Sequence, residues 1–161
     1  MLKALVSQGG DPQFDRLRMA PRALVSPWGR IIDAYVFGRS YQEREKGQHG
    51  TVVDTLDASD PRWRERELII LPSHVTGCTV DIDEIIRVAH RAGFDIICAT
   101  VIFTEHIPED RRLFADIWEK AWDERWTIPN PRRDPEDRNL AAQLSALGCD
   151  LWTWICRALA S

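Results

Sequence analysis

The sequence has no strong charge of one sign and no apolar run long enough to cross a membrane. Its 161 residues include 21 basic and 25 acidic side chains, which leaves a formal net charge of -4. Such a balance provides no long-range attraction to nucleic acid or to an anionic membrane. The longest largely apolar run, residues 96–104, is far shorter than the about 20 residues of a membrane-spanning helix. We therefore expect no membrane partner, and the composition disfavours nucleic acid.

Several sequence motifs are also missing. The first ten residues contain one cation and only a three-residue apolar stretch, which falls short of a secretory signal. Without such a signal or a membrane-spanning run we expect a cytoplasmic protein. Its four cysteines show no C-x-x-C spacing, so we expect reduced thiols. Glycine-rich phosphate loops and the G-x-S-x-G motif do not occur, which disfavours nucleotide chemistry and serine hydrolysis.

Short apolar runs bounded by turn residues predict a group of strands. A weak apolar stretch in the first ten residues predicts a short strand. The clearer runs occupy residues 23–25, 30–37, 51–56, 67–72 and 96–104. The motif Ser26-Pro27-Trp28-Gly29 has the residues of a type I turn and predicts a hairpin between the first two runs. The polar stretch 42–50 predicts a loop.

Three segments carry helical patterns, at residues 81–93, 108–126 and 134–158. The first has Asp81 and Glu84 as a capping pair and Gly93 after its last turn. In the third, leucines recur at helical spacing on both sides of Gly148, which predicts one long C-terminal helix. We expect a single domain, residues 1–161, of the α+β (or α/β) class, with a mixed sheet of about four to six strands and about three helices.

Polar residues follow two of the predicted strands in the same way. Ser73 and His74 come after the run 67–72, and Glu105 and His106 come after the run 96–104. If these runs form one β-α-β unit, both pairs emerge at the same sheet edge, where open sheets place their ligand sites.

Cys78 would lie near this edge and widens the chemistry that it offers. Imidazole, thiolate and carboxylate are ligands that zinc accepts, and a thiolate beside an imidazole is a nucleophile. The alternative hypothesis is therefore a metal-assisted or Cys/His-dependent hydrolase. Its catalytic residues would be His74, Cys78, Glu105 and His106, with zinc held by His74, Cys78 and His106.

The tryptophans indicate a different kind of site. There are seven, and the last predicted helix is apolar nearly all round from Leu151 to Ala160, where only Thr153 and Arg157 are polar. Such a segment needs cover from its own domain, from a second copy or from a partner. Tryptophan and arginine together favour binding hot spots. The predicted partner-binding residues are Trp126, Trp152, Trp154 and Arg157.

The leading hypothesis is a non-catalytic protein-interaction module without a cofactor. The chain has only three lysines among its 21 basic residues, a composition typical of GC-rich bacterial genomes. A small acidic protein without catalytic motifs also has the profile of inhibitors carried by phages and mobile elements. We therefore expect an inhibitor or adaptor that binds a larger bacterial complex, or forms a homodimer.

Overall fold

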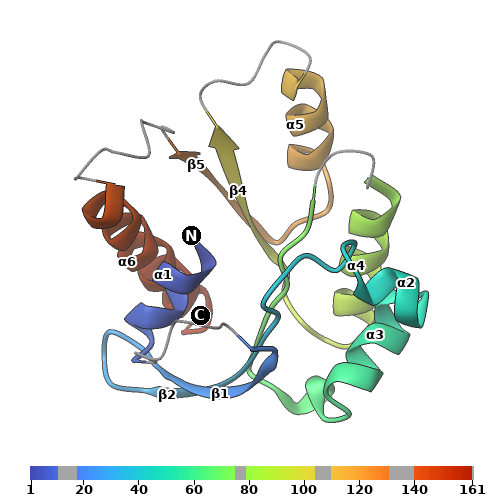
Figure 1. The fold of residues 1–161 in the computed structure, drawn as a ribbon, viewed down its shortest axis with the longest axis horizontal. Helices are drawn as coiled ribbons and strands as arrows, with labels where there is room; N and C mark the ends of the chain where they lie inside the picture. The colour runs from blue at the N-terminus through green and yellow to red at the C-terminus, as the bar shows by residue number, and fades with distance from the viewer. Residues whose placement is uncertain (11–17, 75–78, 104–109, 131–139, 161) are drawn as a thin grey trace. The chain divides into compact units, whose positions relative to one another are not determined.

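The computed structural model describes residues 1–10, 18–74, 79–103, 110–130 and 140–160. Within these residues the chain forms six α-helices, one short 3-10 helix and five strands in two small sheets (Figure 1). The α+β class and the long C-terminal helix are confirmed, and the strands are divided between two sheets instead of lying in one. None of the described helices has both the length and the apolar character that crossing a bilayer requires.

The chain divides into two compact units that each draw on separate stretches of sequence. The first unit comprises Met1–Arg39, Leu56–Pro72 and Asp134–Ser161, and the second comprises Ser40–Thr55 and Ser73–Arg133. Helix α3, Val52–Ser59, contributes its beginning to the second unit and its end to the first. The single domain of the sequence analysis stays a prediction.

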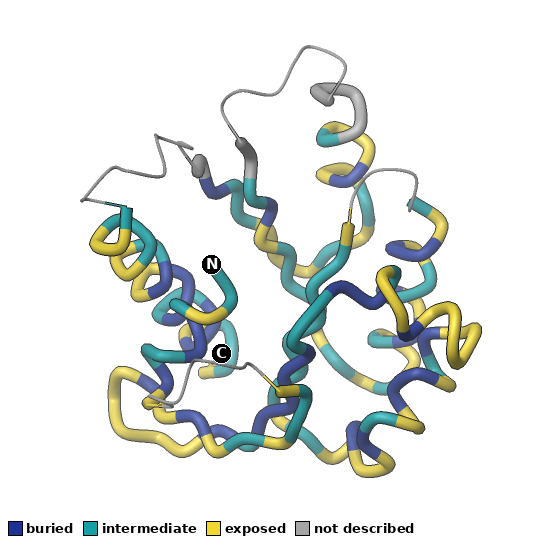
Figure 2. The backbone as a smooth tube through the Cα atoms, viewed as in Figure 1, coloured by how far each residue is buried: buried dark blue, intermediate teal, exposed yellow. Residues whose placement is uncertain are grey.

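The first unit is built on a three-stranded sheet and two helices. Its elements are α1 (Leu2–Gln8), β1 (Ala20–Val25), β2 (Ile31–Val36), the 3-10 helix η1 (Trp63–Glu65), β3 (Leu68–Ile70) and α6 (Leu140–Ala158). Strand β2 lies in the middle, antiparallel to β1 and parallel to β3. More and less exposed residues alternate along β1, so one face of the hairpin is buried (Figure 2).

The predicted turn between the first two strands is confirmed. The Gly29 amide donates to the Ser26 carbonyl at 3.0 Å, and Val25 and Ile31 face each other across the hairpin. Gly29 has a φ of 82°, a conformation that side chains rarely adopt. A glycine at this position therefore lets the chain enter β2 directly after the turn.

Helices α1 and α6 pack closely at a glycine. A Cβ atom built on Gly148 would lie 2.7 Å from the carbonyl carbon of Ala4, too close for any real contact. The predicted continuation of α6 through Gly148 is confirmed, and the glycine is needed for this approach. The N-terminal stretch predicted as a strand is helix α1, because Leu5 and Val6 are both buried on its inner face.

The second unit contains a parallel pair of strands covered by helices. Its elements are α2 (Glu45–His49), α4 (Thr79–Arg91), β4 (Ile97–Phe103), α5 (Asp110–Trp118) and β5 (Glu124–Asn130). Strands β4 and β5 run parallel with α5 between them in the chain, which is a β-α-β crossover. Ile82, Ile86 and Ile117 form the core, with Cys98 of β4 packed against it.

Two predicted elements have the wrong secondary structure. Residues 51–56 are predicted as a strand. In the structure Val52 begins helix α3, and Thr51 precedes the helix as its cap. The Thr51 hydroxyl accepts the Asp54 amide at 3.1 Å and donates to the Asp54 carboxylate at 2.6 Å, and this cap favours the helix over the β-propensity of Val52 and Val53. The loop predicted over 42–50 contains the short helix α2.

Helix α5 is also shorter than the helix predicted over residues 108–126. Helix α5 ends at Trp118, and the chain turns so that the Trp122 indole donates to the Ile117 carbonyl at 2.7 Å. Trp126 then lies in β5, opposite Ala99 of β4. Trp118, Trp122 and Trp126 are spaced four residues apart in the sequence, as in a helix, but pairing with β4 determines the structure at Trp126.

Helix α4 differs from its prediction only at its start. It begins at Thr79, two residues before Asp81, and Gly93 follows it with a φ of 82° as predicted. Asp81 accepts a hydrogen bond from the Lys46 ammonium at 2.7 Å, and Glu84 accepts the Val52 amide at 3.2 Å. These two acids therefore connect α4 to α2 and α3 instead of capping α4.

Candidate functional site

The predicted β-α-β unit formed by runs 67–72 and 96–104 is wrong. Strand β3 pairs with β2, and β4 pairs with β5 in the other sheet of the described residues. The helix predicted over 108–126 overlaps the first three residues of β5 (Glu124–Asn130), and the sequence analysis predicts no strand there, so β5 is not identified as the parallel neighbour of β4. The strands that precede Ser73–His74 and Glu105–His106 in the sequence therefore belong to different sheets, and the hydrolase hypothesis loses its geometric basis.

Of the residues proposed for a hydrolase, the structure describes His74, whereas Cys78, Glu105 and His106 lie outside the described residues. His74 is exposed, and its Nε2 lies 3.3 Å from the Glu43 carboxylate. Its backbone amide donates to the Gln42 side chain at 3.1 Å, and the same side chain donates to the Ser73 hydroxyl at 2.7 Å. These contacts hold the chain after β3 against residues 42–43, which is a structural role.

The remaining metal and thiol chemistry of the described residues is limited. Across the described stretches no three His, Cys, Asp or Glu side chains are placed to hold one metal ion. Burial raises the pKa of the Cys98 thiol, and burial raises the pKa of Cys156 to about 11. Both thiols are therefore protonated at neutral pH, and a protonated thiol is a poor nucleophile.

The predicted partner face on α6 is corrected at its central residue. Trp152 is only 2% exposed, and its indole donates to the Val25 carbonyl at 3.0 Å. It is an internal contact of the first unit and cannot be a partner-binding residue in this fold. Arg30 also donates to the Leu159 carbonyl at 3.0 Å, so the hairpin holds the end of α6.

The other three predicted partner residues differ in exposure. Trp126 and Trp154 are half-buried, and Arg157 is exposed. The apolar end of α6 was predicted to be covered by its own domain, by a second copy or by a partner. The contacts of Trp152 and Arg30 support cover by its own domain. The buried residues of this segment, Leu151, Trp152, Ile155 and Cys156, lie on one face of α6, so the need for cover on more than one side stays a prediction.

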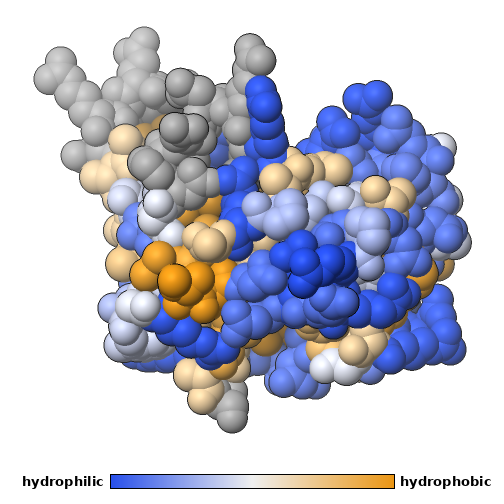
Figure 3. All heavy atoms as spheres, turned by 90° about the horizontal axis from the view of Figure 1, so that it is seen from below, coloured by the Kyte–Doolittle hydropathy of each residue, from blue (hydrophilic) through white to orange (hydrophobic). Residues whose placement is uncertain are grey.

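A different apolar surface lies at the end of the β1–β2 hairpin. Val25 is 41% exposed, Trp28 61% and Ile31 67%, and we call these three residues the hairpin patch. Val25 and Ile31 are direct cross-strand neighbours on the face opposite the buried pair Leu24 and Ile32. Figure 3 views the molecule from the side of this hairpin and shows hydrophobic surface bordered by hydrophilic side chains. Exposed tryptophan beside aliphatic residues is typical of protein contact sites.

The turn that carries Trp28 is held by hydrogen bonds around one buried serine. The Ser26 hydroxyl accepts the amides of Trp28 at 3.3 Å and Arg30 at 3.0 Å, and the Ser26 amide donates to the Arg30 carbonyl at 2.8 Å. Ser26 itself is buried. These hydrogen bonds fix the backbone of the turn that carries Trp28.

The sequence predicts this turn but not the exposed patch beside it. In a hairpin turn the central residues project away from the sheet, so a tryptophan at the third turn position is exposed by geometry. That signal was present in Ser26-Pro27-Trp28-Gly29. The exposure of Val25 and Ile31 could not be read in the same way, because it depends on which face of the hairpin is covered.

Comparison with protein-family models, with curated proteins and with solved structures found no match for this chain.

Proposed function

We propose that this protein is a non-catalytic protein-interaction module, an adaptor or inhibitor of a larger bacterial complex, which binds its partner through the hairpin patch. The observation that carries the proposal is the exposure of Val25, Trp28 and Ile31 together at one end of a rigid hairpin. Trp28 would be the anchor, because large aromatic side chains dominate binding energies at contact sites.

Partner binding by strand addition is disfavoured at the β1 edge. The Val25 amide donates to Gly9 and not to β2, so alternate residues of β1, including Pro21, turn their backbone outward. Proline has no amide hydrogen and blocks the pairing of another strand. This supports docking on the open face of the hairpin instead of on its edge.

A binding comparison tests the proposal. The wild type, a Trp28→Ala, Ile31→Ser double variant and the control Val80→Ser are immobilised separately and exposed to a bacterial lysate. Val80 is 77% exposed on α4, so the control removes an equally accessible apolar side chain from the other unit. We expect a partner that the wild type and Val80→Ser retain and that the double variant loses.

The captured partner is then purified and titrated against all three proteins by calorimetry. Loss of two exposed apolar anchors should weaken binding at least about 30-fold, which corresponds to about 2 kcal/mol. Equal affinity for the double variant and the wild type would refute the hairpin patch as the contact site. Sedimentation of the wild type shows whether it is a homodimer or a monomer that binds another protein. If it is a homodimer, the double variant should dissociate.

A further inference from the structure

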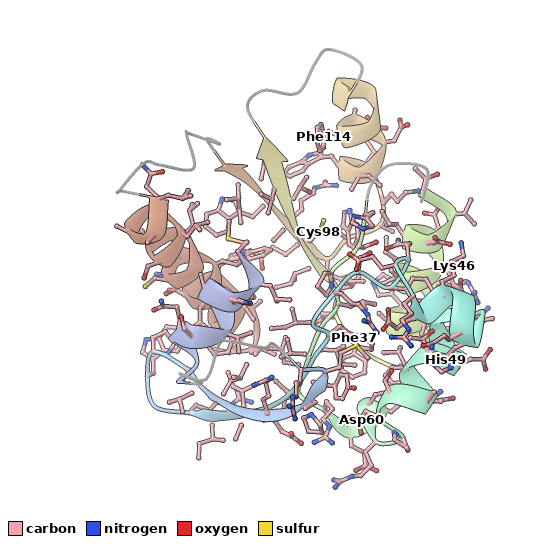
Figure 4. The ribbon with its side chains drawn as sticks, viewed as in Figure 1. Phe37, Lys46, His49, Asp60, Cys98 and Phe114 are labelled. Carbon is pink, nitrogen blue, oxygen red and sulfur yellow. The ribbon has the colours of Figure 1, made fainter. Side chains whose placement is uncertain are left out.

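The second unit contains a cavity between α5 and the parallel strands β4 and β5. It has a volume of about 240 Å³ and is lined by Thr100, Phe114, Ala115, Trp118, Glu119 and Thr127. Phe114 lies between α5 and β4 in Figure 4. Because drug-sized ligands occupy pockets of about 300 Å³ or more, this cavity suits a smaller molecule.

Two threonine hydroxyl groups belong to the base of the cavity. Thr100 of β4 and Thr127 of β5 are paired in register, so their side chains lie next to each other on one face of the sheet. Thr100 is only 8% exposed, and its hydroxyl lies 3.5 Å from the Cys98 sulfur. A hydroxyl has one donor and two acceptor sites, and a thiol is a weak partner for one of them. Capacity for a stronger hydrogen bond therefore remains.

The wall on the α5 side is aromatic. Phe114 and Trp118 are four residues apart on the helix and therefore share a face. The Arg125 guanidinium lies 5.2 Å from the centre of the Trp118 ring and donates to the Trp118 carbonyl, which fixes the end of α5 to β5. This cation already occupies the tryptophan ring, so the ring is not available to a cationic ligand on that side.

We propose that this cavity binds a small neutral aromatic heterocycle with hydrogen-bonding groups on its edge, of the class of the free nucleobases. The ring would lie against Phe114 and Trp118, and its edge would meet the hydroxyls of Thr100 and Thr127. The Glu119 carboxylate, which also lines the cavity, would accept a hydrogen bond from an exocyclic amino group. Amino-bearing bases are therefore preferred. This proposal does not depend on the hairpin patch, which belongs to the other unit.

Titration of the full chain with adenine, followed by ¹H–¹⁵N NMR and by tryptophan fluorescence, tests the proposal. We expect saturable shifts of the Thr100 and Thr127 amides. Hypoxanthine, which has a carbonyl group in place of the amino group, should bind at least about fivefold more weakly. Benzene probes the ring without the edge, and tetramethylammonium probes an organic cation. Saturable binding of either with the affinity of adenine would overturn the proposal, as would no adenine binding at millimolar concentrations.

Variants show whether the threonine hydroxyls recognise the ligand. Thr100→Val and Thr127→Val keep the side-chain shape and should each weaken adenine binding about tenfold, the effect of one lost hydrogen bond. Thr153→Val is the matched control, since Thr153 lies on α6 in the first unit and its hydroxyl bonds to the Cys149 carbonyl. If Thr100→Val fails to fold, the result from Thr127→Val decides. Unchanged affinity in the folded threonine variants would refute the proposed recognition.

Discussion

At the scale of single residues, the first unit depends on carboxylates held by arginines. Arg66 donates to Asp60 at 2.7 Å and to Asp33 at 2.7 Å, and the side chains of Arg66 and Asp60 are both largely buried. The hydrogen bond from Arg66 holds the pKa of Asp60 below its ordinary value. Glu67 has a lowered pKa as well, from the Asp33 amide and then from Arg30. These groups join the segment before β3 to β2.

The lowered pKa of Asp60 predicts how stability changes with pH. A carboxylate whose folded-state pKa is depressed stabilises the fold above its unfolded pKa of about 3.9, and this contribution is lost as the pH falls through the folded-state pKa. Asp60→Asn should therefore lower the free energy of unfolding at pH 7, and the difference from wild type should shrink toward pH 3. Urea unfolding between pH 3 and 7 measures it. Asp150→Asn, at an exposed site on α6, is the control, and an Asp60→Asn deficit that does not change with pH would contradict the assignment.

At the scale of helices, the contact between α1 and α6 gives a prediction about two glycines. Gly148→Ala places a methyl group against the Ala4 backbone and should lower the free energy of unfolding by about 2 kcal/mol, because the packed helices must separate. Gly47→Ala is the matched control, since a Cβ built there in α2 meets no atom within 4 Å beyond its chain neighbours and its own helix backbone. It should be neutral or stabilising by up to about 1 kcal/mol. Urea denaturation compares the two, and a Gly148→Ala variant as stable as wild type would show that the helices do not need this contact.

How well each element could be predicted depended on where its determinants lie. The hairpin turn and α6 follow from local chemistry, since Ser26, Gly29 and the leucine spacing of α6 specify them without any partner. Helix α1 and strand β5 have weak or misleading local patterns and are decided by what they pack against. The cap of α3 is a local signal, Thr51 with Asp54, that the sequence contains but that the β-propensity of Val52 and Val53 obscures.

At the scale of the whole molecule, the candidate sites were harder to predict than the fold class. The strand-end site required the right choice of neighbours for β4, and strand pairing between distant segments is not encoded in either strand alone. The α6 face required knowledge of which side of the helix the hairpin covers, and Trp152 turned out to donate to Val25. The hairpin patch could be found only once the covered face of the sheet was known.

The path of the chain gives the last prediction, which concerns whether the two units unfold together. The chain passes between them at residues 39–40, 55–56, 72–73 and 133–134, and the second of these points lies inside α3. Unfolding one unit would therefore break a helix of the other and release the ends of its segments. We expect a single cooperative transition, as for one domain.

Gly148→Ala and Trp152→Phe perturb only the first unit, so they test this coupling. Each variant should lower hydrogen-exchange protection in helix α6 and in strand β4 by the same free energy, because a cooperative fold loses stability everywhere at once. Hydrogen exchange followed by NMR reads each element separately, with the amide of Leu151 reporting on α6 and the amide of Thr100 on β4. If Thr100 keeps its wild-type protection while Leu151 loses protection, the units unfold independently, and the chain comprises two domains instead of one.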